Sequence, residues 1–350
     1  MQIDRKELER LLYAGHGRAI VYLLQQDLRE YRDLILDFCV HHNKCYDRQL
    51  EPNRDAYLYP LIEASGESDW YKNKIIEALY NISDDFDISQ IYDFLWLFAE
   101  EDLGINDVIK DAKSKNKYFA EYLKDIEPTP KNDVIDVRRK RKELYESVEG
   151  LSWEEMKAFK SGFIYYDYWA RQTSEDEFIK ASNDVILETD RKELFKMLSI
   201  FKTRLFPFDL KILINLFNVF DDASYRILYI LGNIESNEVR NLFYKLIKDS
   251  NWIYHSLILL KSNYKIEDNT VINSILMKAE DNDDIHRVCQ SSLDIFECNL
   301  SPDAIEILIM MYDKSPCSLC RERSAELLKK LGPLPQFIID ELVYDCQRKP

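Results

Sequence analysis

Glycine and proline are scarce in this chain, with 8 and 10 copies in 350 residues. Proteins built from many short strands need frequent turn residues, so the scarcity argues against a sandwich or a barrel. Hydrophobic residues make up 46% of the chain and aromatic residues 13%, a composition that excludes a disordered protein. The length fits one large domain or two of ordinary size.

Long apolar stretches and an export signal are also missing. The longest apolar runs, IYDFLWLFA and SLILL, are much shorter than the roughly 20 residues that span a bilayer. The first residues, MQIDRKELERLL, lack the apolar segment of a signal peptide. We therefore expect a cytoplasmic protein without membrane association, whose cysteines are reduced.

Positive charge is in deficit, because 47 Lys and Arg face 63 Asp and Glu, for a net charge of −16. A general nucleic-acid binder needs a basic surplus, so we do not expect a nucleic-acid partner. An acidic surface can simply keep the protein soluble, which is the favoured interpretation, or it can attract a basic protein. The one strong basic run could contact nucleic acid, or it could be the solvated start of a helix; it consists of Arg138, Arg139, Lys140, Arg141 and Lys142.

The familiar catalytic motifs are absent from the sequence. GHGRAI lacks the Lys-Ser/Thr ending of a phosphate-binding loop, and there is no G-x-S-x-G, H-E-x-x-H or kinase signature. Paired carboxylates fall at expected helix boundaries, where capping explains them: Asp84/Asp85, Asp221/Asp222 and Asp283/Asp284. No catalytic residue and no cofactor is predicted, and the sequence leans against an enzyme.

Apolar residues recur at helical spacing along almost the whole chain, as in ELERLLYAGHGRAIVYLLQQ. Ser152 and Ser174 are each followed by Glu three residues later, which predicts capping boxes at two helix starts. Several glycines follow helical runs and are expected to close them in the left-handed conformation: Gly66, Gly104, Gly150 and Gly332. These signals predict an all-α fold.

Helix starts recur about every 16 residues in the second half, so two helices give a repeat of about 30 to 35 residues. We place them near Ser174, Asp190, Asp209, Asp222, Ser236, Asn251, Asn269, Asp283, Ser301, Cys317 and Pro335. The short connections predict antiparallel neighbours, and stacked pairs of this kind form an α-solenoid.

The segment DASYRILYILGNIESNEVRNLFYKLIKDSNWIYHSLILLKS carries a family resemblance. Arg240 stands where the second helix of a HEAT repeat often has a basic residue, and Asp249 or Asn251 stands at the following turn. Residues 174–346 resemble a HEAT or armadillo array. The resemblance implies an α–α superhelix and a general binding role, without a particular activity.

A loop divides the chain into two predicted lobes. Pro128 and Pro130 disfavour helix before them, and many charges follow. We therefore expect an N-terminal helical lobe at residues 1–125, a charged hinge at 126–140 and a HEAT-like lobe at 141–346. Two lobes of one continuous solenoid are favoured over two unrelated domains.

Cysteines and histidines gather in CVHHNKC, which offers four zinc ligands in Cys39, His41, His42 and Cys45. The spacing matches no usual zinc framework. Cys39 is expected on the apolar face of its helix, and the histidines at the last turn, where they stabilise the negative end of the dipole.

Cys317 and Cys320 form a C-x-x-C pair, which is half a zinc site, a redox pair or two small buried side chains. A site that joins them to Cys39 and Cys45 requires the two ends of the chain to meet, which we do not expect. No metal site is predicted; the candidate ligands are Cys39, His42, Cys45, Cys317 and Cys320.

Polar residues crowd the junction YDRQLEPNRDAYLY, where Asp47, Gln49, Glu51 and Arg54 are the candidates. They could form a network that ties the loop to neighbouring helices, with Arg54 as the forked donor to a carboxylate. They could also bind a polar ligand. The sequence favours the structural role.

The densest aromatic stretch is FKSGFIYYDYWARQ. Tyr166 lies on its main apolar stripe, so Tyr165, Tyr168 and Trp169 must lie off that stripe. This helix is therefore either buried on two sides or offers an aromatic binding surface.

Together these features predict a non-enzymatic interaction protein that binds a basic partner along an acidic solenoid surface. An immunity-type or regulatory protein that masks a nuclease or toxin is one form of this prediction. The first alternative is a HEAT-like DNA-binding protein or alkylpurine DNA glycosylase. The second is a metal-binding regulatory module that uses Cys39 to Cys45.

Overall fold

The computed structural model describes residues 3–44, 46, 54–102, 104–126, 142–159, 163–219 and 221–346. Within these ranges the chain contains helices and no strand, which confirms the all-α prediction. The described part of the chain has no helix whose length and hydropathy suit a membrane crossing.

The chain divides into two compact units. Unit 1 comprises Met1–Thr129, Asp281–His286 and Ile305–Pro350, and unit 2 comprises Pro130–Glu280 and Arg287–Ala304. This division differs from the predicted lobes, because the last segment of the chain belongs with the first.

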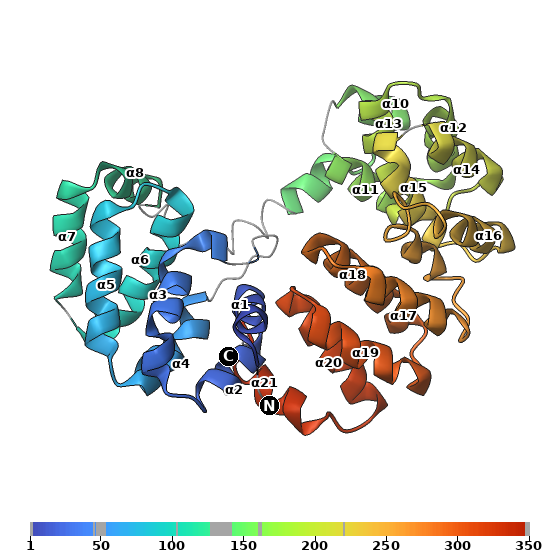
Figure 1. Ribbon diagram of the computed structural model, residues 1–350. Helices are drawn as coiled ribbons and strands as arrows, with labels where there is room; N and C mark the ends of the chain where they lie inside the picture. The colour runs from blue at the N-terminus through green and yellow to red at the C-terminus, as the bar shows by residue number, and fades with distance from the viewer. Residues whose placement is uncertain are drawn as a thin grey trace. The chain divides into compact units, whose positions relative to one another are not determined.

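Unit 1 is built from helices at both ends of the chain (Figure 1). They are α1 (Arg5–Tyr13), α2 (Gly17–Leu23), η1 (Leu28–Tyr31), α3 (Arg32–Val40), η2 (His42–Lys44), α4 (Arg54–Ser65), α5 (Ser68–Asn81), α6 (Asp85–Glu101), α7 (Ile105–Lys115), α8 (Lys117–Ile126), α19 (Ile305–Lys314), α20 (Ser318–Leu331) and α21 (Gln336–Leu342). Successive helices pack on each other, as α5 does on α6, α7 on α8 and α19 on α20. One continuous apolar core runs beneath α1 to α8.

A buried arginine joins the first and last segments of unit 1. Arg321 is 0% exposed and donates to both carboxylate oxygens of Asp345, at 2.7 and 2.9 Å. It also donates to the carbonyl oxygens of Ala14 and Gly15, at 2.9 and 3.0 Å. The expectation that the chain ends do not meet is therefore wrong, because the buried Arg321 guanidinium bonds to carbonyl groups of the first segment.

Helices α2 and α21 approach so closely that glycine is required between them. A Cβ atom at Gly17 would lie 1.8 Å from the carbonyl oxygen of Glu341. On the same helices, the Arg18 Nε donates to a Glu341 carboxylate oxygen at 2.7 Å. The close approach and the ion pair together fix the C-terminal helix against the N-terminal one.

Unit 2 holds the helices in the middle of the chain (Figure 1). They are α10 (Trp153–Ala158), α11 (Phe163–Gln172), α12 (Glu175–Leu187), α13 (Arg191–Met197), η3 (Leu198–Lys202), α14 (Leu210–Val219), α15 (Asp221–Gly232), α16 (Asn237–Leu246), η4 (Ser256–Leu260), α17 (Asp268–Lys278) and η5 (Pro302–Ala304). Helix α18 (Asn282–Cys298) begins in unit 1 and continues in unit 2 after His286.

The capping signals placed most helix starts correctly. Ser152 makes the predicted capping box with Glu155, and the Ser174 side chain accepts from the Glu177 backbone N–H. Near Asn251 the structure has turns instead of an α-helix, followed by the 3₁₀ helix η4.

Two of the four predicted closing glycines are left-handed. Gly66 and Gly150 have φ of 67° and 73°. Gly104 instead precedes α7 with φ of −63°, and Gly332 is extended with φ of 166°, so these two expectations are wrong.

Candidate ligand pocket

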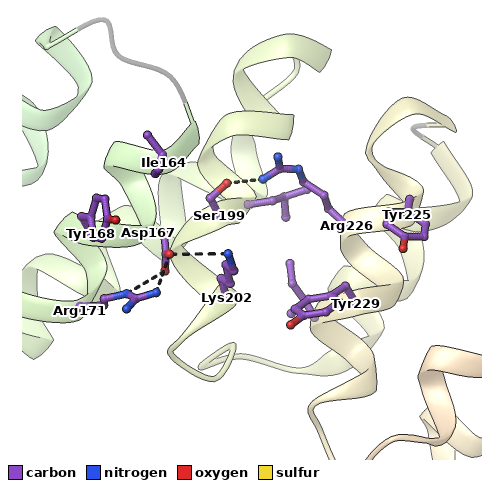
Figure 2. Close-up of a pocket in the computed structure, with 11 residues that line it drawn as sticks. Ile164, Asp167, Tyr168, Arg171, Ser199, Lys202, Tyr225, Arg226 and Tyr229 are labelled. Atoms are coloured by element: carbon purple, nitrogen blue, oxygen red, sulfur yellow. Dashed lines mark hydrogen bonds and ion pairs between the residues drawn. The ribbon is translucent and has the colours of Figure 1, made fainter. Parts of the chain in front are cut away.

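A pocket of about 490 Å³ lies in unit 2 between α11, η3 and α15 (Figure 2). Its volume is within the range of small-ligand sites. Three basic side chains line it, Arg171, Lys202 and Arg226, together with one carboxylate, Asp167. The lining therefore carries a formal excess of two positive charges in a chain whose net charge is −16.

Asp167 organises one side of the pocket. It is buried, and its Oδ2 lies 2.8 Å from the Arg171 Nη2 and 4.0 Å from the Lys202 Nζ. The hydrogen bond with Asp167 raises the pKa of Arg171. Because Asp167 and Arg171 are four residues apart on α11, the helix itself places them on one face. This carboxylate holds two cations at the pocket wall.

Arg226 approaches from the opposite side, on α15. Its Nη1 donates to the Ser199 hydroxyl, and its guanidinium lies 3.8 Å from the centre of the Phe195 ring. Burial lowers the pKa of Arg226. A guanidinium packed on a ring has little freedom, so its position is set before any ligand arrives.

Tyrosines provide the aromatic part of the lining, with Tyr168 on α11 and Tyr225 and Tyr229 on α15. Tyr225 is 49% exposed, and Tyr229 follows it by one helical turn, so both rings face the same side. Figure 2 shows Arg226 extending from α15 to Ser199, and the Tyr229 ring on the side of α15 that faces Lys202. The pocket can thus hold a group that combines negative charge with a flat apolar body.

The three aromatic candidates from the sequence have separate positions. Tyr168 lines the pocket. Tyr165 is half-buried and packs against Phe159, with ring centres 5.3 Å apart. Trp169 is 1% exposed, and its indole N–H donates to the Leu151 carbonyl at 2.8 Å. Trp169 is therefore a core residue and not part of a binding surface, because its polar atom is already satisfied inside the fold.

Arg54 is the one member of the polar junction among the described residues. It is 7% exposed, and its Nη2 donates to the Leu12 carbonyl at 2.5 Å. Its guanidinium lies 5.0 Å from the centre of the Tyr57 ring. These contacts tie α4 to α1, as expected for a structural network. The other candidates lie outside the described residues: Asp47, Gln49 and Glu51.

The basic run is described only at Lys142, since Arg138, Arg139, Lys140 and Arg141 lie outside the described residues. The Lys142 side chain is 76% exposed, and its Nζ lies 3.6 Å from a Glu146 carboxylate oxygen. An exposed cation beside an acidic neighbour agrees with the solvated-helix interpretation of this residue.

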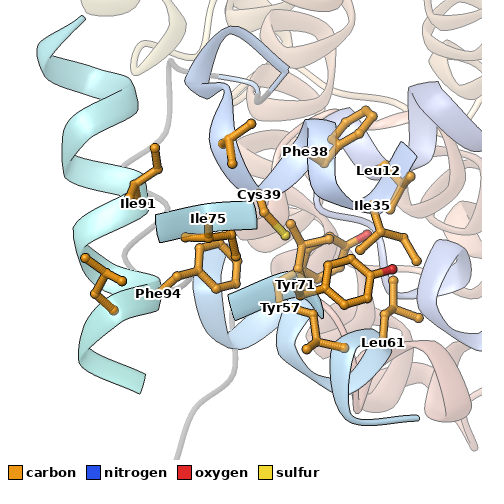
Figure 3. Close-up of a cluster of buried hydrophobic side chains, with 14 of the residues drawn as sticks. Leu12, Ile35, Phe38, Cys39, Tyr57, Leu61, Tyr71, Ile75, Ile91 and Phe94 are labelled. Carbon is orange, nitrogen blue, oxygen red and sulfur yellow. The ribbon is translucent and has the colours of Figure 1, made fainter. Parts of the chain in front are cut away.

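Cys39 and His42 have different surroundings. Cys39 is 0% exposed and lies in the unit 1 core with Ile35 and Tyr71 (Figure 3). The His42 ring stacks on Phe86, with ring centres 5.1 Å apart. Cys45 lies outside the described residues. The position of Cys39 agrees with the expectation that it belongs to an apolar helix face.

Cys317 and Cys320 lie at the start of α20 and are 1% and 2% exposed. Cys317 caps this helix, because its Sγ accepts from the Cys320 backbone N–H at 3.2 Å. The hydrogen bond with the Cys320 thiol lowers the pKa of the Cys317 thiol to about 5, against the opposing effect of burial. The prediction that the two thiols form a buried pair is therefore correct on burial.

A second pocket, of about 520 Å³, lies in unit 1 beside α2 and α21. Its charged lining residues include Arg18, Asp313 and Glu341. Arg18 pairs with both carboxylates. Because one cation faces three carboxylates here, Glu306 included, this pocket is the weaker candidate for an anionic ligand.

Of the residues that line the unit 2 pocket, only Tyr168 was singled out from the sequence. Two further pairs could have been found from their spacing. Asp167 and Arg171 stand four residues apart in YYDYWARQ, as do Tyr225 and Tyr229 in DASYRILYILG. Each pair shares a helix face. The packing of both helices on η3, which brings the two pairs to one pocket, could not be read from the sequence.

The resemblance to HEAT arrays rested partly on Arg240. In the structure this residue donates to both carboxylate oxygens of the buried Asp268, at 2.6 and 2.8 Å. It therefore ties α16 to α17. Comparison with protein-family models, with curated proteins and with solved structures finds no match, so the HEAT resemblance stays a prediction.

Proposed function

We propose that this chain is a non-enzymatic interaction protein, built as a HEAT-like solenoid of antiparallel helix pairs, that holds an anionic group of its partner in the unit 2 pocket. The observation that supports the proposal is the excess of cations in the pocket lining. Arginine matches carboxylate and phosphate with two parallel hydrogen bonds, and Arg171 and Arg226 flank the cavity.

The charge of the whole chain and the charge of the pocket lining favour two different features of one partner. A chain of net charge −16 attracts a partner with a basic surface at long range. Inside the pocket, three cations select a local acidic or phosphorylated group, and the tyrosine rings favour one attached to an aromatic body. An immunity-type or regulatory protein that masks a basic toxin or nuclease fits both features.

Calorimetric titration of the full chain with phenyl phosphate tests the pocket, with inorganic phosphate and phenol as separate probes. We expect phenyl phosphate to bind more tightly than either, because it engages the cations and the rings together. Arg226→Gln and Arg171→Gln should each weaken binding by about 10-fold or more, since each removes a charged hydrogen bond.

Lys180→Gln is the matched control, because Lys180 is an exposed cation of unit 2 that pairs with Glu177 outside the pocket lining. It should leave the affinity unchanged. Equal affinities for phenyl phosphate in all four proteins would count against the pocket.

A DNA-acting protein is the second candidate, and one observation favours it. The pocket combines a carboxylate, Asp167, with cations and aromatic rings, which is the set that a HEAT-like DNA glycosylase requires. Against it, Asp167 is paired with Arg171, and the net charge is −16. Duplex DNA carrying an alkylated purine should bind in a salt-dependent way and lose that base if this candidate is right. Absence of both effects at low salt would dismiss it.

A further inference from the structure

Three metal-ligating side chains converge in unit 1, away from the pocket. They are His286 near the start of α18 and Cys317 and Cys320 at the start of α20. Their ligand atoms all lie within 4.8 Å of one another. Two thiols and an imidazole are a donor set that suits Zn²⁺.

The spacing agrees with one shared ion. With Zn–S near 2.3 Å and Zn–N near 2.1 Å, two ligands of a tetrahedral site lie roughly 3.5 to 3.8 Å apart. The Cys320 Sγ lies 3.7 Å from the His286 Nδ1. The side chains therefore need only small rotations to place all three donor atoms around one centre.

Hydrogen bonds of neighbouring residues fix the backbone around the two cysteines. Arg321, next in sequence after Cys320, is 0% exposed and donates to the Ser315 carbonyl at 2.9 Å. The Ser315 hydroxyl accepts from the Cys317 backbone N–H at 3.2 Å. Ligands fixed in this way bind an ion with little loss of side-chain freedom.

The histidine is also positioned by its surroundings. The Tyr46 ring packs near the His286 ring, with centres 6.1 Å apart, and the Tyr46 hydroxyl donates to Asp283 at 3.3 Å. Asp283 stands on the same helix as His286. These contacts hold the first turn of α18 near the start of α20.

We propose that His286, Cys317 and Cys320 bind one Zn²⁺ that links the start of α18 to the start of α20. The three protein donors leave one tetrahedral position for water or a further ligand. Only the C-x-x-C half of the site was predicted from the sequence, because the distance from His286 to the cysteines matches no usual zinc spacing. This inference concerns residues outside the unit 2 pocket and is independent of the proposed function.

The first test is metal content and Co²⁺ substitution in the untagged full chain, purified with a thiol reductant. We expect one Zn²⁺ per chain, and a near-ultraviolet thiolate-to-cobalt absorption band after exchange. His286→Ala, Cys317→Ser and Cys320→Ser should each lower the affinity by more than the roughly 10- to 100-fold that loss of an outer partner causes.

Cys298→Ser is the matched control, because Cys298 is an exposed thiol on α18. It should keep the zinc and the cobalt band. Background zinc with no cobalt band in the wild type would overturn the proposal, as would an equal loss of metal in Cys298→Ser.

A second test uses the wild-type chain alone, so it does not depend on the folding of a variant. Bound Zn²⁺ should protect Cys317 and Cys320 from alkylation, and a chelator should remove that protection. If a reductant removes the protection and a chelator does not, the pair is a disulfide and the metal site is refuted. Alkylation that Zn²⁺ does not slow would refute it as well.

Discussion

At the scale of single residues, two glycines lie where the backbone of another segment approaches too closely for a side chain. A Cβ atom at Gly17 would meet the Glu341 carbonyl oxygen at 1.8 Å, and one at Gly232 would meet the Ile258 carbonyl oxygen at 2.3 Å. Gly15 ends α1 with φ of 62°, whereas Gly17 is needed for packing.

Gly17→Ala should lower the free energy of unfolding by about 1–3 kcal/mol, because backbone atoms of α2 and α21 must move apart. Urea denaturation followed by circular dichroism measures the loss. Gly332→Ala is the control, since no atom lies within 4 Å of its added Cβ and its backbone is extended. Equal stability of the two variants would contradict the packing argument.

His255 gives unit 2 a dependence on pH. Its ring packs between Tyr225 and Trp252, with ring centres 5.5 and 5.8 Å away. Burial, followed by the charge of Arg287, lowers the pKa of His255 to about 4. The unfolded chain, with a pKa of about 6.5, binds this proton more readily. Stability from the neutral ring is therefore complete above about pH 6.5 and is lost as the pH falls towards 4.

His255→Gln should unfold with a smaller drop in urea midpoint between pH 7 and pH 4.5 than the wild type, because it carries no titrating ring. The comparison uses the difference between the two proteins, since carboxylates contribute to both. Parallel pH profiles would show that His255 does not contribute to the acid response.

At the scale of elements, local side-chain chemistry made helix starts predictable. Ser152, Ser174, Asp190 and Ser236 all cap helices through their own oxygen atoms. These bonds join atoms two or three residues apart, so the sequence alone contains both partners. Gly104 shows the limit of such reasoning, because nothing local distinguishes a residue that begins a helix from one that ends the previous helix.

The pair Asp84/Asp85 tests the capping interpretation with a matched control. Asp84 precedes α6, and its Oδ1 accepts from the backbone N–H groups of Phe86 and Asp87, at 3.0 and 3.1 Å. Asp84→Ala should lower the free energy of unfolding by about 1 kcal/mol, because two N–H groups lose their acceptor. Asp85→Ala should cost only a few tenths of that, since Asp85 contributes through the helix dipole. Thermal unfolding of both variants measures the two losses of stability. Equal losses would mean that the negative charge, and not the capping hydrogen bonds, stabilises the helix start.

At the scale of the whole chain, the sequence contained few signals. The partners of Arg321 lie both near it, at Asp345, and at the opposite end of the chain, at Ala14 and Gly15. No periodicity or motif encodes a contact over that separation. The convergence of His286 with Cys317 and Cys320, and of α11 with α15 around the pocket, was hidden for the same reason.

Arg321→Met should destabilise the chain by about 3–5 kcal/mol, because the Asp345 carboxylate, 3% exposed, stays buried without its ion partner. Adding Asp345→Asn should recover part of that loss, since it removes the stranded charge. Lys74→Met is the control, because Lys74 and Glu77 form an exposed pair at 2.6 Å, which is worth no more than about 1 kcal/mol.

Urea denaturation of these three variants and the wild type gives the comparison. A double variant that is less stable than Arg321→Met would mean that the two side chains contribute separately. Recovery in the double variant would mean that the stranded Asp345 charge, and not only the lost hydrogen bonds to Ala14 and Gly15, causes the destabilisation. Ala14 and Gly15 lie far from Arg321 in the sequence, and their hydrogen bonds to it form only when unit 1 is folded. The loss of Arg321 should therefore affect global unfolding rather than fraying of one helix.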